Sequence, residues 1–388
     1  MVIKSIKVML IPNNKQKTKM FHFCGAKRFA YNWAIAKERE NYSNGGKFIS
    51  DCELRKEFTK LKKTEEYSWL YTISNDVTKQ AIKDACMSYR RFFNGNSKAP
   101  KFKSKKTDRP SFYVDNVKIK FTDTHVKLEN IATSKKKNKA KLNWIRLAEK
   151  GRIPTNCKYI NPHVVFDGAN FWISVGVEVE DILETPSNSG IGIDLGIKDL
   201  AICSDNNTYK NINKTKEVKR LKKKKRRLQR KVSRKYLINK KGVSYYKTSN
   251  IIKLENQLLK LNHRLTNIRQ NYLHQETTEI INRKPMFIAL EDLNVSGMMK
   301  NRHLAKAIQE QCFYEFRRII TYKAEWNNIK VIVVPRFYPS SKTCHECGAI
   351  NKGLKLSDRE WVCQECGVIH DRDYNASVNL MKYGQSIA

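Results

Sequence analysis

Four cysteines near the C-terminus constrain the fold of this chain more than any other feature. They form two C-x2-C pairs separated by fifteen residues: Cys344, Cys347, Cys363 and Cys366. Gly348 and Gly367 follow the pairs, and glycine suits the tight turn that lets two thiolates approach one ion. The spacing is typical of a zinc ribbon. We therefore predict a closed, structural Zn²⁺ site, with His345 and His370 nearby but not needed as ligands.

The remaining cysteines and the chain start indicate the compartment. Six cysteines occur singly, which is typical of reduced thiols in a cytosolic protein. No run of 18 apolar residues is present, and the start, MVIKSIKVMLIPNNK, has no signal-peptide core. We expect a soluble, cytoplasmic protein. A redox or disulfide pair is the alternative to zinc, but two matched C-x2-C pairs favour the metal.

The net charge of the chain indicates the class of its binding partner. The chain has 388 residues with 76 Lys+Arg and 37 Asp+Glu, a formal net charge of +39. So large an excess repels itself without a polyanion, so nucleic acid is the expected partner and an acidic membrane surface a distant second. A hydrophobic content of 40% is enough to bury real cores, and the length suggests two or three domains.

The densest cationic segment spans residues 214–235, where fourteen of twenty-two residues are Lys or Arg and the one acid is Glu217. Apolar residues at heptad-like intervals predict a helix here, and the 4-3-4-3-4 spacing of apolar residues over 254–272 predicts its mate. We expect an antiparallel helical hairpin, either a solvated coiled coil or, as we favour, a phosphate-binding arm. The predicted contacts are Lys222, Lys223, Arg226, Arg227 and Arg230.

A second basic stretch, KAPKFKSKKTDRPSF, has neither helical nor strand periodicity. Its predicted phosphate contacts are Lys101, Lys103, Lys105 and Lys106. Aromatic residues among the cations are candidates for base stacking, although we expect most of them in the core. These aromatics are Trp33, Tyr89, Phe92, Phe93, Phe102, Phe112 and Tyr113.

Periodicity and turn residues divide the rest of the chain. A strand at 1–12 precedes a mostly helical region to about residue 95, and short strands recur over 112–180, with a hairpin turn at Asp167-Gly168. Residues 185–190 resemble a linker. A meander of three antiparallel strands follows, then buried strands at 285–291 and 330–335 with a helical stretch around 304–326 between them. A last helix follows the cysteine pairs.

Several carboxylates stand out against this positive charge. Asp194 interrupts the apolar strand GIGIDLGI, Glu291 ends MFIALE, and Asp371 and Asp373 precede the last helix. If the strands are neighbours, these acids can converge and hold the two Mg²⁺ ions that phosphodiester cleavage uses. The alternatives are that Asp371 or Asp373 is a helix N-cap and that Glu291 ends its strand in solvent.

At these residues the sequence resembles the RuvC-like nucleases of the transposon-encoded TnpB family, relatives of the type V CRISPR effectors. GIDLGIKDLA resembles the first RuvC motif and IALEDLNVSGM the second, while CHECG with REWVCQECGVIHDRDYNASVNL resembles the zinc ribbon running into the third. GAKRFAYNWAI and PKFKSKK match the N-terminal half, so the resemblance covers nearly the whole chain. The family's third ligand is the aspartate of D-x-N-A, which is Asp373 here, with Asp371 as the alternative.

The resemblance implies a multidomain α+β and α/β fold. Residues 1–185 would form a wedge-like β-barrel with a helical recognition insertion at about 13–100. Residues 186–388 would form an RNase H-like (RuvC) domain that carries a basic helical hairpin at 214–283 and a zinc ribbon at 340–370. Asp194 would be the bridging metal ligand, and Glu291 and Asp373 the flanking ones, for Mg²⁺ or a substituting Mn²⁺.

The resemblance also implies partners: a guide RNA from the transposon end, and double-stranded target DNA cut on both strands beside a short adjacent motif. Base pairing then supplies sequence recognition while the protein holds the nucleic-acid backbone. We expect a monomeric protein in a prokaryotic, cytoplasmic ribonucleoprotein that joins the nucleoid when bound to DNA. The alternatives are a compact CRISPR effector, a non-cleaving regulator on the same scaffold, and a DNA-joining transposase, for which no paired His with a downstream Tyr is present.

Overall fold

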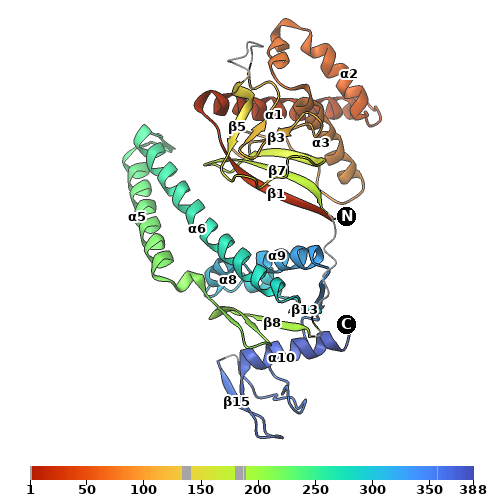
Figure 1. Cartoon of the computed structure of the whole chain (residues 1–388). Coiled ribbons are helices and arrows are strands. Elements are labelled where there is room, and N and C mark those ends of the chain that lie inside the picture. The colour runs from red at the N-terminus through yellow and green to blue at the C-terminus, as the bar shows by residue number, and fades with distance from the viewer. Residues whose placement is uncertain (1, 133–140, 180–186, 188, 356) are drawn as a thin grey trace. The chain divides into compact units, whose positions relative to one another are not determined.

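The structure is a computed structural model that describes residues 2–132, 141–179, 187, 189–355 and 357–388. The chain divides into two compact units, Met1–Glu180 and Asp181–Ala388 (Figure 1). Among the described helices, none has the length and apolar character that crossing a membrane requires. The linker predicted at 185–190 lies largely outside the described residues.

The first unit is built on a sheet of seven antiparallel strands in the order β2-β6-β7-β1-β5-β4-β3. The strands are β1 Val2–Ile11, β2 Ser111–Tyr113, β3 Lys120–Phe121, β4 His125–Lys127, β5 Trp144–Leu147, β6 Tyr159–Phe166 and β7 Phe171–Val179. The predicted hairpin turn between β6 and β7 is confirmed. Gly168 has a φ of 100°, and the Asp167 carboxylate accepts hydrogen bonds from the backbone N–H groups of Ala169 and Asn170, each at 2.8 Å.

This sheet curls without closing. The ring of Phe121 on edge strand β3 packs against Tyr159 of β6, with 4.8 Å between the ring centroids. Among the described residues no ladder joins β3 to β2. The sheet is therefore open in its hydrogen bonding, and a closed wedge-like barrel stays a prediction.

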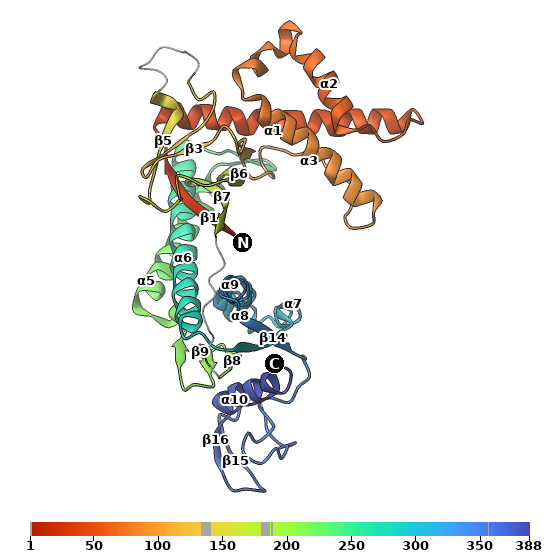
Figure 2. The same ribbon diagram turned by 45° about the vertical axis from the view of Figure 1, so that its right-hand side comes forward.

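The predicted helical region between β1 and β2 is present. It comprises α1 Asn14–Ser43, α2 Asp51–Lys62, the 3-10 helix η1 Glu65–Thr72 and α3 Asn75–Phe93. A capping box between Asn13 and Gln16 starts α1. The Gln16 side chain also donates to the carbonyl oxygens of Leu142 and Trp144, at 2.9 Å each, which ties α1 to the 3-10 helix η2 Lys141–Asn143 and to β5. Figure 2 shows α1 as the longest helix of this unit.

The second unit contains a five-stranded sheet in the order β10-β9-β8-β13-β14. Its strands are β8 Ile191–Leu195, β9 Asp199–Cys203, β10 Thr208–Lys210, β13 Phe287–Glu291 and β14 Lys330–Val334. β8, β9 and β10 pair antiparallel, which confirms the predicted meander, whereas β13 pairs in parallel with both β8 and β14.

Helices cover both faces of this sheet. They include α9 Phe313–Trp326 and α10 Arg372–Gln385. Two short helices, α7 Val295–Met298 and α8 Ala305–Gln311, precede α9 in the chain. On one face Ile193 and Leu290 share a core with Phe316 of α9, and on the other Ala289 packs with Leu380 of α10. Figures 1 and 2 show α9 and α10 on opposite sides of β8 and β13. The two apolar strands predicted at 285–291 and 330–335 are therefore interior strands, as their composition indicated.

The predicted helical hairpin is confirmed as α5 Lys216–Ile238 and α6 Ser249–Asn282, preceded by the 3-10 helix η3 Ile212–Lys214. A short ladder, β11 Lys240–Lys241 with β12 Ser244–Tyr245, forms its tip. Val218 and Leu221 of α5 pack against Leu261 and Leu265 of α6. The two short strands β15 Glu360–Val362 and β16 Ile369–Asp371 lie on either side of the second cysteine pair.

Candidate active site and metal centre

Asp194 and Glu291 lie on one face of the sheet. In the parallel ladder of β8 and β13, Ile193 pairs with Leu290, so Asp194 and Glu291 are the next residues along the two strands. Strand side chains alternate between faces, and Ile193 and Leu290 belong to the core under α9. Both carboxylates therefore lie on the face that α10 covers, at the C-terminal ends of adjacent parallel strands.

A glycine brings α10 onto this face. A Cβ atom at Gly192 would lie 2.0 Å from the Ser377 carbonyl oxygen and 2.4 Å from the Met381 backbone nitrogen. At the other end of the helix, a Cβ at Gly384 would lie 2.3 Å from the Phe287 ring. Because Phe287 begins β13, α10 runs antiparallel to β8 and β13. Its first turn, with Asp373, is thus brought to the strand ends that carry Asp194 and Glu291.

Asp371 and Asp373 have different roles at this helix start. The Asp371 side chain accepts hydrogen bonds from the backbone N–H groups of Asp373, at 3.0 Å, and Tyr374, at 2.8 Å, so Asp371 is the N-cap. Asp373 lies inside the first turn and pairs with Arg359, with 3.0 Å between Oδ2 and Nη1. The sequence alternative, that an acid here is an N-cap, is correct for Asp371.

Electrostatics single out Asp194. Its side chain is partly buried. Burial raises the pKa of Asp194 well above its ordinary value, the neighbouring carboxylates of Glu291 and Asp373 raise it further, and Arg372 opposes them. Such a concentration of negative charge in a strongly basic protein is the environment that a bound cation neutralises.

Sequence reasoning missed the side chains that orient Glu291. Ser340 Oγ donates to Glu291 Oε1 at 2.5 Å. The amide nitrogen of Asn379 donates in turn to the carbonyl oxygen of Ser340 at 2.8 Å, and the fully buried Asn375 donates to that of Thr343 at 2.8 Å. Asn375 is the asparagine of D-x-N-A, a motif residue to which the sequence assigned no role. This network joins the segment before the first cysteine pair to α10.

Asp292 follows Glu291 in the chain but is held by two arginines. Arg317 and Arg336 bind it at 2.8 and 2.6 Å, and their hydrogen bonds hold the pKa of Asp292 below its ordinary value. The neighbouring carboxylate, that of Glu291, accepts a hydrogen bond from the Ser340 hydroxyl.

The four cysteines form the one group of at least three His, Cys, Asp or Glu residues in the described chain whose ligand atoms all lie within 4.8 Å of one another. The three carboxylates share a face but are not gathered as closely. The Cys344–Cys366 and Cys347–Cys363 Sγ pairs are each 3.6 Å apart. Tetrahedral zinc with Zn–S bonds of about 2.3 Å places its sulfurs about 3.8 Å apart, whereas a disulfide needs about 2.05 Å. This geometry fits one tetrahedral metal ion.

The turns around these thiols follow the predicted pattern. Gly348 and Gly367 have φ angles of 79° and 72°, in the left-handed region that glycine adopts freely. Backbone N–H groups in the second turn lower the pKa of the Cys363 thiol to about 7, whereas burial and the neighbouring thiols raise the pKa values of Cys347 and Cys366. His370 was not predicted as a ligand, and its Nε2 lies 3.0 Å from Cys344 Sγ, so it contacts the cluster directly.

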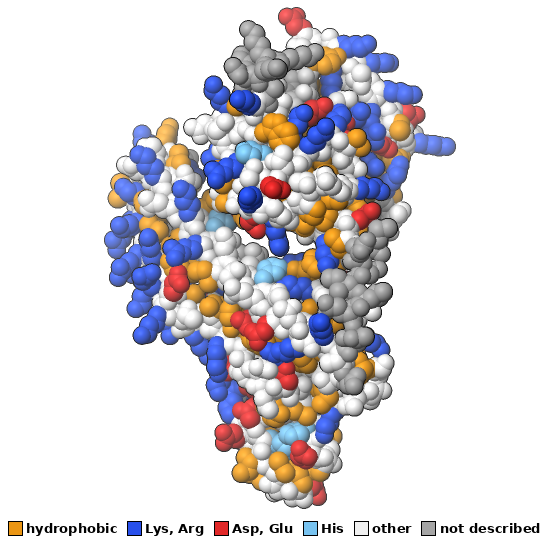
Figure 3. Space-filling model, in the orientation of Figure 1, with side chains coloured by type: hydrophobic (Ala, Val, Ile, Leu, Met, Phe, Trp, Pro, Cys, Tyr) orange, Lys and Arg blue, Asp and Glu red, His pale blue; other side chains and the backbone are white. Residues whose placement is uncertain are grey.

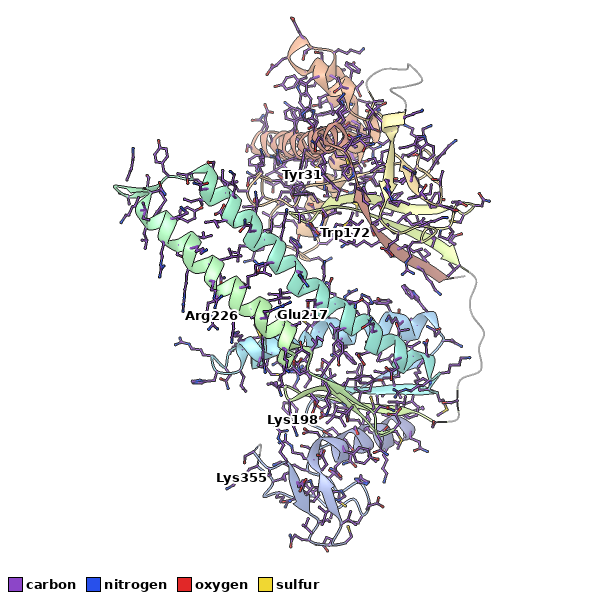
Figure 4. The ribbon with its side chains drawn as sticks, turned by 60° about the vertical axis from the view of Figure 1, so that its left-hand side comes forward. Tyr31, Trp172, Lys198, Glu217, Arg226 and Lys355 are labelled. Carbon is purple, nitrogen blue, oxygen red and sulfur yellow. The ribbon has the colours of Figure 1, made fainter. Side chains whose placement is uncertain are left out.

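The predicted cations of α5 are mostly in solvent. Lys223, Arg226, Arg227 and Arg230 are exposed, whereas Lys222 is partly buried and its ammonium binds Glu310 at 2.6 Å. Figure 3 shows Lys and Arg side chains concentrated over this arm, and Figure 4 labels Glu217 and Arg226 on it. Lys222 is therefore a predicted cation whose ammonium is already paired within the protein.

The predicted lysines near residue 100 also differ in solvent exposure. Lys101, Lys105 and Lys106 are exposed. Lys103 is partly buried, with its ammonium 4.0 Å from the centre of the Tyr31 ring, and this burial lowers its pKa. The absence of periodicity suggested four exposed lysines, but an aromatic ring packs against one of them.

Three family models match the chain. Residues 1–47 match one described as a helix-turn-helix domain, residues 174–302 one described as "Probable transposase" (OrfB_IS605), and residues 313–380 one described as "Cas12f1-like, TNB domain". The described part of residues 1–47 holds strand β1 and the single helix α1. The third match contains the cysteine cluster and Asp373.

Full-length relatives give the clearest comparison. A protein of Streptomyces pristinaespiralis named "Putative RNA-guided DNA endonuclease" is 30% identical over 99% of this chain and 90% of its own length. One of Escherichia coli (strain K12), named "Putative RNA-guided DNA endonuclease InsQ", is 28% identical over 99% and 93%. A solved structure of the mini-RNA-guided endonuclease CRISPR-Cas_phi3 overlaps 98% of this chain and 92% of its own at 10% identity, with a TM-score of 0.49. By its family models and its full-length relatives, the chain belongs to the TnpB family, the OrfB proteins of IS605-type transposons.

Proposed function

We propose that this protein is a transposon-encoded, RNA-guided DNA endonuclease that hydrolyses phosphodiester bonds with Mg²⁺. The observation that carries the proposal is the shared face of Asp194 and Glu291, onto which Gly192 admits α10 and Asp373. The central strands and the helices on both faces support an RNase H-like (RuvC) assignment for the second unit. The curled sheet of the first unit supports a wedge-type role in binding guide RNA and the target-adjacent DNA.

The donor set fits Mg²⁺, because carboxylate oxygens are the hard ligands that this ion prefers. Asp194, Glu291 and Asp373 would hold it, and the bound metal would activate water and stabilise the leaving oxygen. Ser340 fixes the orientation of the Glu291 carboxylate. Asp371 satisfies the first N–H groups of α10, which leaves Asp373 to turn toward the site. The positive end of the α10 dipole also favours a phosphate at this place.

We assign the cysteine cluster to one structural Zn²⁺, since four thiolates leave no position open for chemistry. The ion would hold the segment from which Ser340 and the α10 network extend. The exposed cations of α5 and of residues 101–106 would bind nucleic-acid backbones, while base pairing with the guide reads the target.

The test of catalysis compares Asp194→Ala with Asp199→Asn. Asp199 is a matched control because it lies in the neighbouring strand β9, where Lys210 faces it at 3.6 Å. With the native flanking DNA expressed alongside, the wild type should copurify with one discrete RNA and cut a matching DNA in Mg²⁺. Asp194→Ala should bind the same RNA and target without cutting, and Asp199→Asn should cut.

Two results would contradict the proposal. Cleavage by Asp194→Ala would place the active site elsewhere in the chain. Purified wild-type protein that contains no discrete RNA would remove the guided mechanism.

A compact CRISPR effector is the second candidate, favoured by the match of residues 313–380 to the Cas12f1-like domain. It would use the same acids and the same metal. A repeat array next to the coding sequence would decide for it.

A further inference from the structure

The helical part of the first unit contains a cavity of about 500 Å³ with aromatic walls, which we call the aromatic cavity. Its main walls are Phe29 and Trp33 of α1, Tyr67 of η1 and Phe102 of the irregular stretch before β2. The volume lies within the ~300–1,000 Å³ of small-molecule sites. Gly25 lies at its edge, and a Cβ there would meet no atom within 4 Å, so the cavity reaches the helix backbone.

The rings are held in place before any ligand arrives. Phe29 and Tyr67 stack, with 5.5 Å between centroids and 26° between planes. Phe102 is 50% exposed, yet Arg39 lies 4.5 Å from its ring centre and donates to the Pro100 carbonyl oxygen at 2.8 Å. A rigid aromatic surface that is half open to solvent is suited to stacking a flat ring.

The side-chain amide in the cavity wall is already hydrogen-bonded and is not available to read the edge of a base. The side chain of Asn32 accepts from the backbone N–H of Lys103 and donates to its carbonyl oxygen, each at 2.8 Å. Both ends of that amide are therefore occupied. Arg28, which also lines the cavity, makes no hydrogen bond or ion pair with any residue in the described part of the chain. A cation beside stacked rings suits a phosphate next to a stacked base.

Charge around the cavity has two signs. Lys101 and Lys105 are exposed on the stretch that carries Phe102. Glu65 and Glu66 begin η1, and Glu66 raises the pKa of Tyr67 through a hydrogen bond. The anionic backbone of a ligand would therefore approach from α1 and residues 101–105 rather than from η1.

We propose that the aromatic cavity stacks an unpaired base of the guide RNA. This inference rests on the proposed RNA-guided function. Among the nucleic acids of that function, the RNA offers unpaired bases before a target is met, whereas the DNA arrives as a duplex. Unpaired RNA bases are commonly held on aromatic rings and Arg planes. With the Asn32 amide engaged, the site binds by stacking and tolerates different bases.

The experiment measures the affinity of the full-length protein for the RNA that copurifies with it, sequenced and resynthesised. Phe102→Ala should bind this RNA about 5- to 150-fold more weakly, the range expected for one lost stack. Phe102→Trp should retain wild-type affinity. Tyr42→Ala is the matched control, because Tyr42 is 72% exposed on the helix that carries Phe29 and Trp33 but lies outside the cavity walls, and it should bind as the wild type does.

A second variant fills the cavity and leaves every ring in place. Gly25→Leu replaces a helical glycine by a strong helix former where no atom lies within 4 Å, so it should fold and still weaken RNA binding. The salt dependence of binding should keep the wild-type slope in both weakened variants, since no phosphate contact is removed. With 4-thiouridine in the RNA, irradiation should crosslink a base to the peptides that carry Tyr67 or Phe102.

The possible results distinguish a failure of the cavity inference from a failure of the proposed function. Wild-type RNA affinity in both Phe102→Ala and Gly25→Leu would overturn the inference while RNA binding by the unmodified protein still stood. Crosslinks to these peptides from 5-iododeoxyuridine in the DNA, but not from the RNA, would overturn the choice of RNA. If the unmodified protein bound no discrete RNA, the proposed function would fail and the inference with it.

Discussion

At the scale of single residues, Asp194 shows how one polar position in an apolar strand acquires an unusual electrostatic environment. The side chain lies on the α10 face, where burial and the carboxylates of Glu291 and Asp373 outweigh the opposing charge of Arg372. The folded protein therefore contains a charge that it stabilises poorly until a cation binds. A residue kept there only for stability would be apolar or paired.

Removing that charge should stabilise the protein in buffer without Mg²⁺. The folded-state pKa of Asp194 is raised, so the folded chain binds more protons than the unfolded chain, and this group's contribution to stability falls as pH rises above about 4. Asp194→Asn should therefore melt higher than wild type at pH 8, with a gain that shrinks as the pH is lowered. Thermal unfolding followed by circular dichroism measures this, without chelator so that the cysteine cluster keeps its metal.

Asp199→Asn is the control for that experiment. Lys210 lies 3.6 Å from the Asp199 carboxylate, so its removal should give no gain at pH 8. An Asp194→Asn variant that melted below wild type at every pH would contradict the electrostatic description of the site.

At the scale of elements, the packing of α10 on β8 decides whether the site exists. Gly192→Ala places a methyl group 2.0 Å from a helix carbonyl oxygen, and backbone cannot move aside as a flexible side chain can. We expect a loss of roughly 1–3 kcal/mol or more in the stability of the second unit, together with loss of cleavage. Gly353→Ala is the control, because its new atom would meet only Asn351 Oδ1, at an ordinary 3.6 Å. Equal melting temperatures for the two variants would argue against this close approach.

The cysteine cluster is the second decisive element. Cys344→Ser should lower the zinc content from about one ion per chain to none and lower the melting temperature, because metal binding and folding are coupled. Elemental analysis and calorimetry check both quantities. Cys312→Ser is the matched control, since Cys312 lies between α8 and α9 and its hydroxyl replacement can still donate to the Gln309 carbonyl oxygen. Full zinc content in Cys344→Ser would rule out the structural-metal assignment.

The exposed face of α5 supplies a third prediction at this scale. Replacing Arg226, Arg227 and Arg230 together by Ala should reduce the slope of log affinity for RNA against log salt by about 2–3, near 0.7–0.9 per phosphate contact. Lys222→Met is the comparison, because Glu310 already binds that ammonium and little slope should be lost. If both variants kept the wild-type slope, α5 would not be a phosphate-binding arm.

At the scale of the whole molecule, the net charge of +39 sets the behaviour of the free protein. Repulsion among the excess positive charges opposes the compact state, and added salt shortens the distance over which this repulsion acts. Raising NaCl from about 0.05 M to about 0.5 M should therefore raise the melting temperature of the nucleic-acid-free protein while weakening its complex with RNA. A melting temperature that falls with salt would show that the cations are compensated within the fold.

Periodicity and spacing were sufficient for the local structure. The 4-3-4-3-4 spacing on α6 predicted the hairpin, Asp167-Gly168 predicted the turn between β6 and β7, and the C-x2-C pairs predicted the cysteine cluster. Each of these depends on residues close together in the chain, so a repeat of 2, 3.5 or 3.6 residues suffices to read it.

Contacts between distant segments were beyond the reach of these patterns. The occupied ammonium of Lys222, the packing of Lys103 on Tyr31 and the bond from Ser340 to Glu291 join residues far apart in the chain. The choice between Asp371 and Asp373 also depends on the folded structure. It was open in the sequence because both residues precede the same helix. The structure makes Asp371 the N-cap of α10, which favours Asp373 as the proposed ligand. Side chains of one type are alike in sequence, and only the packed chain gives each its own neighbours and solvent exposure.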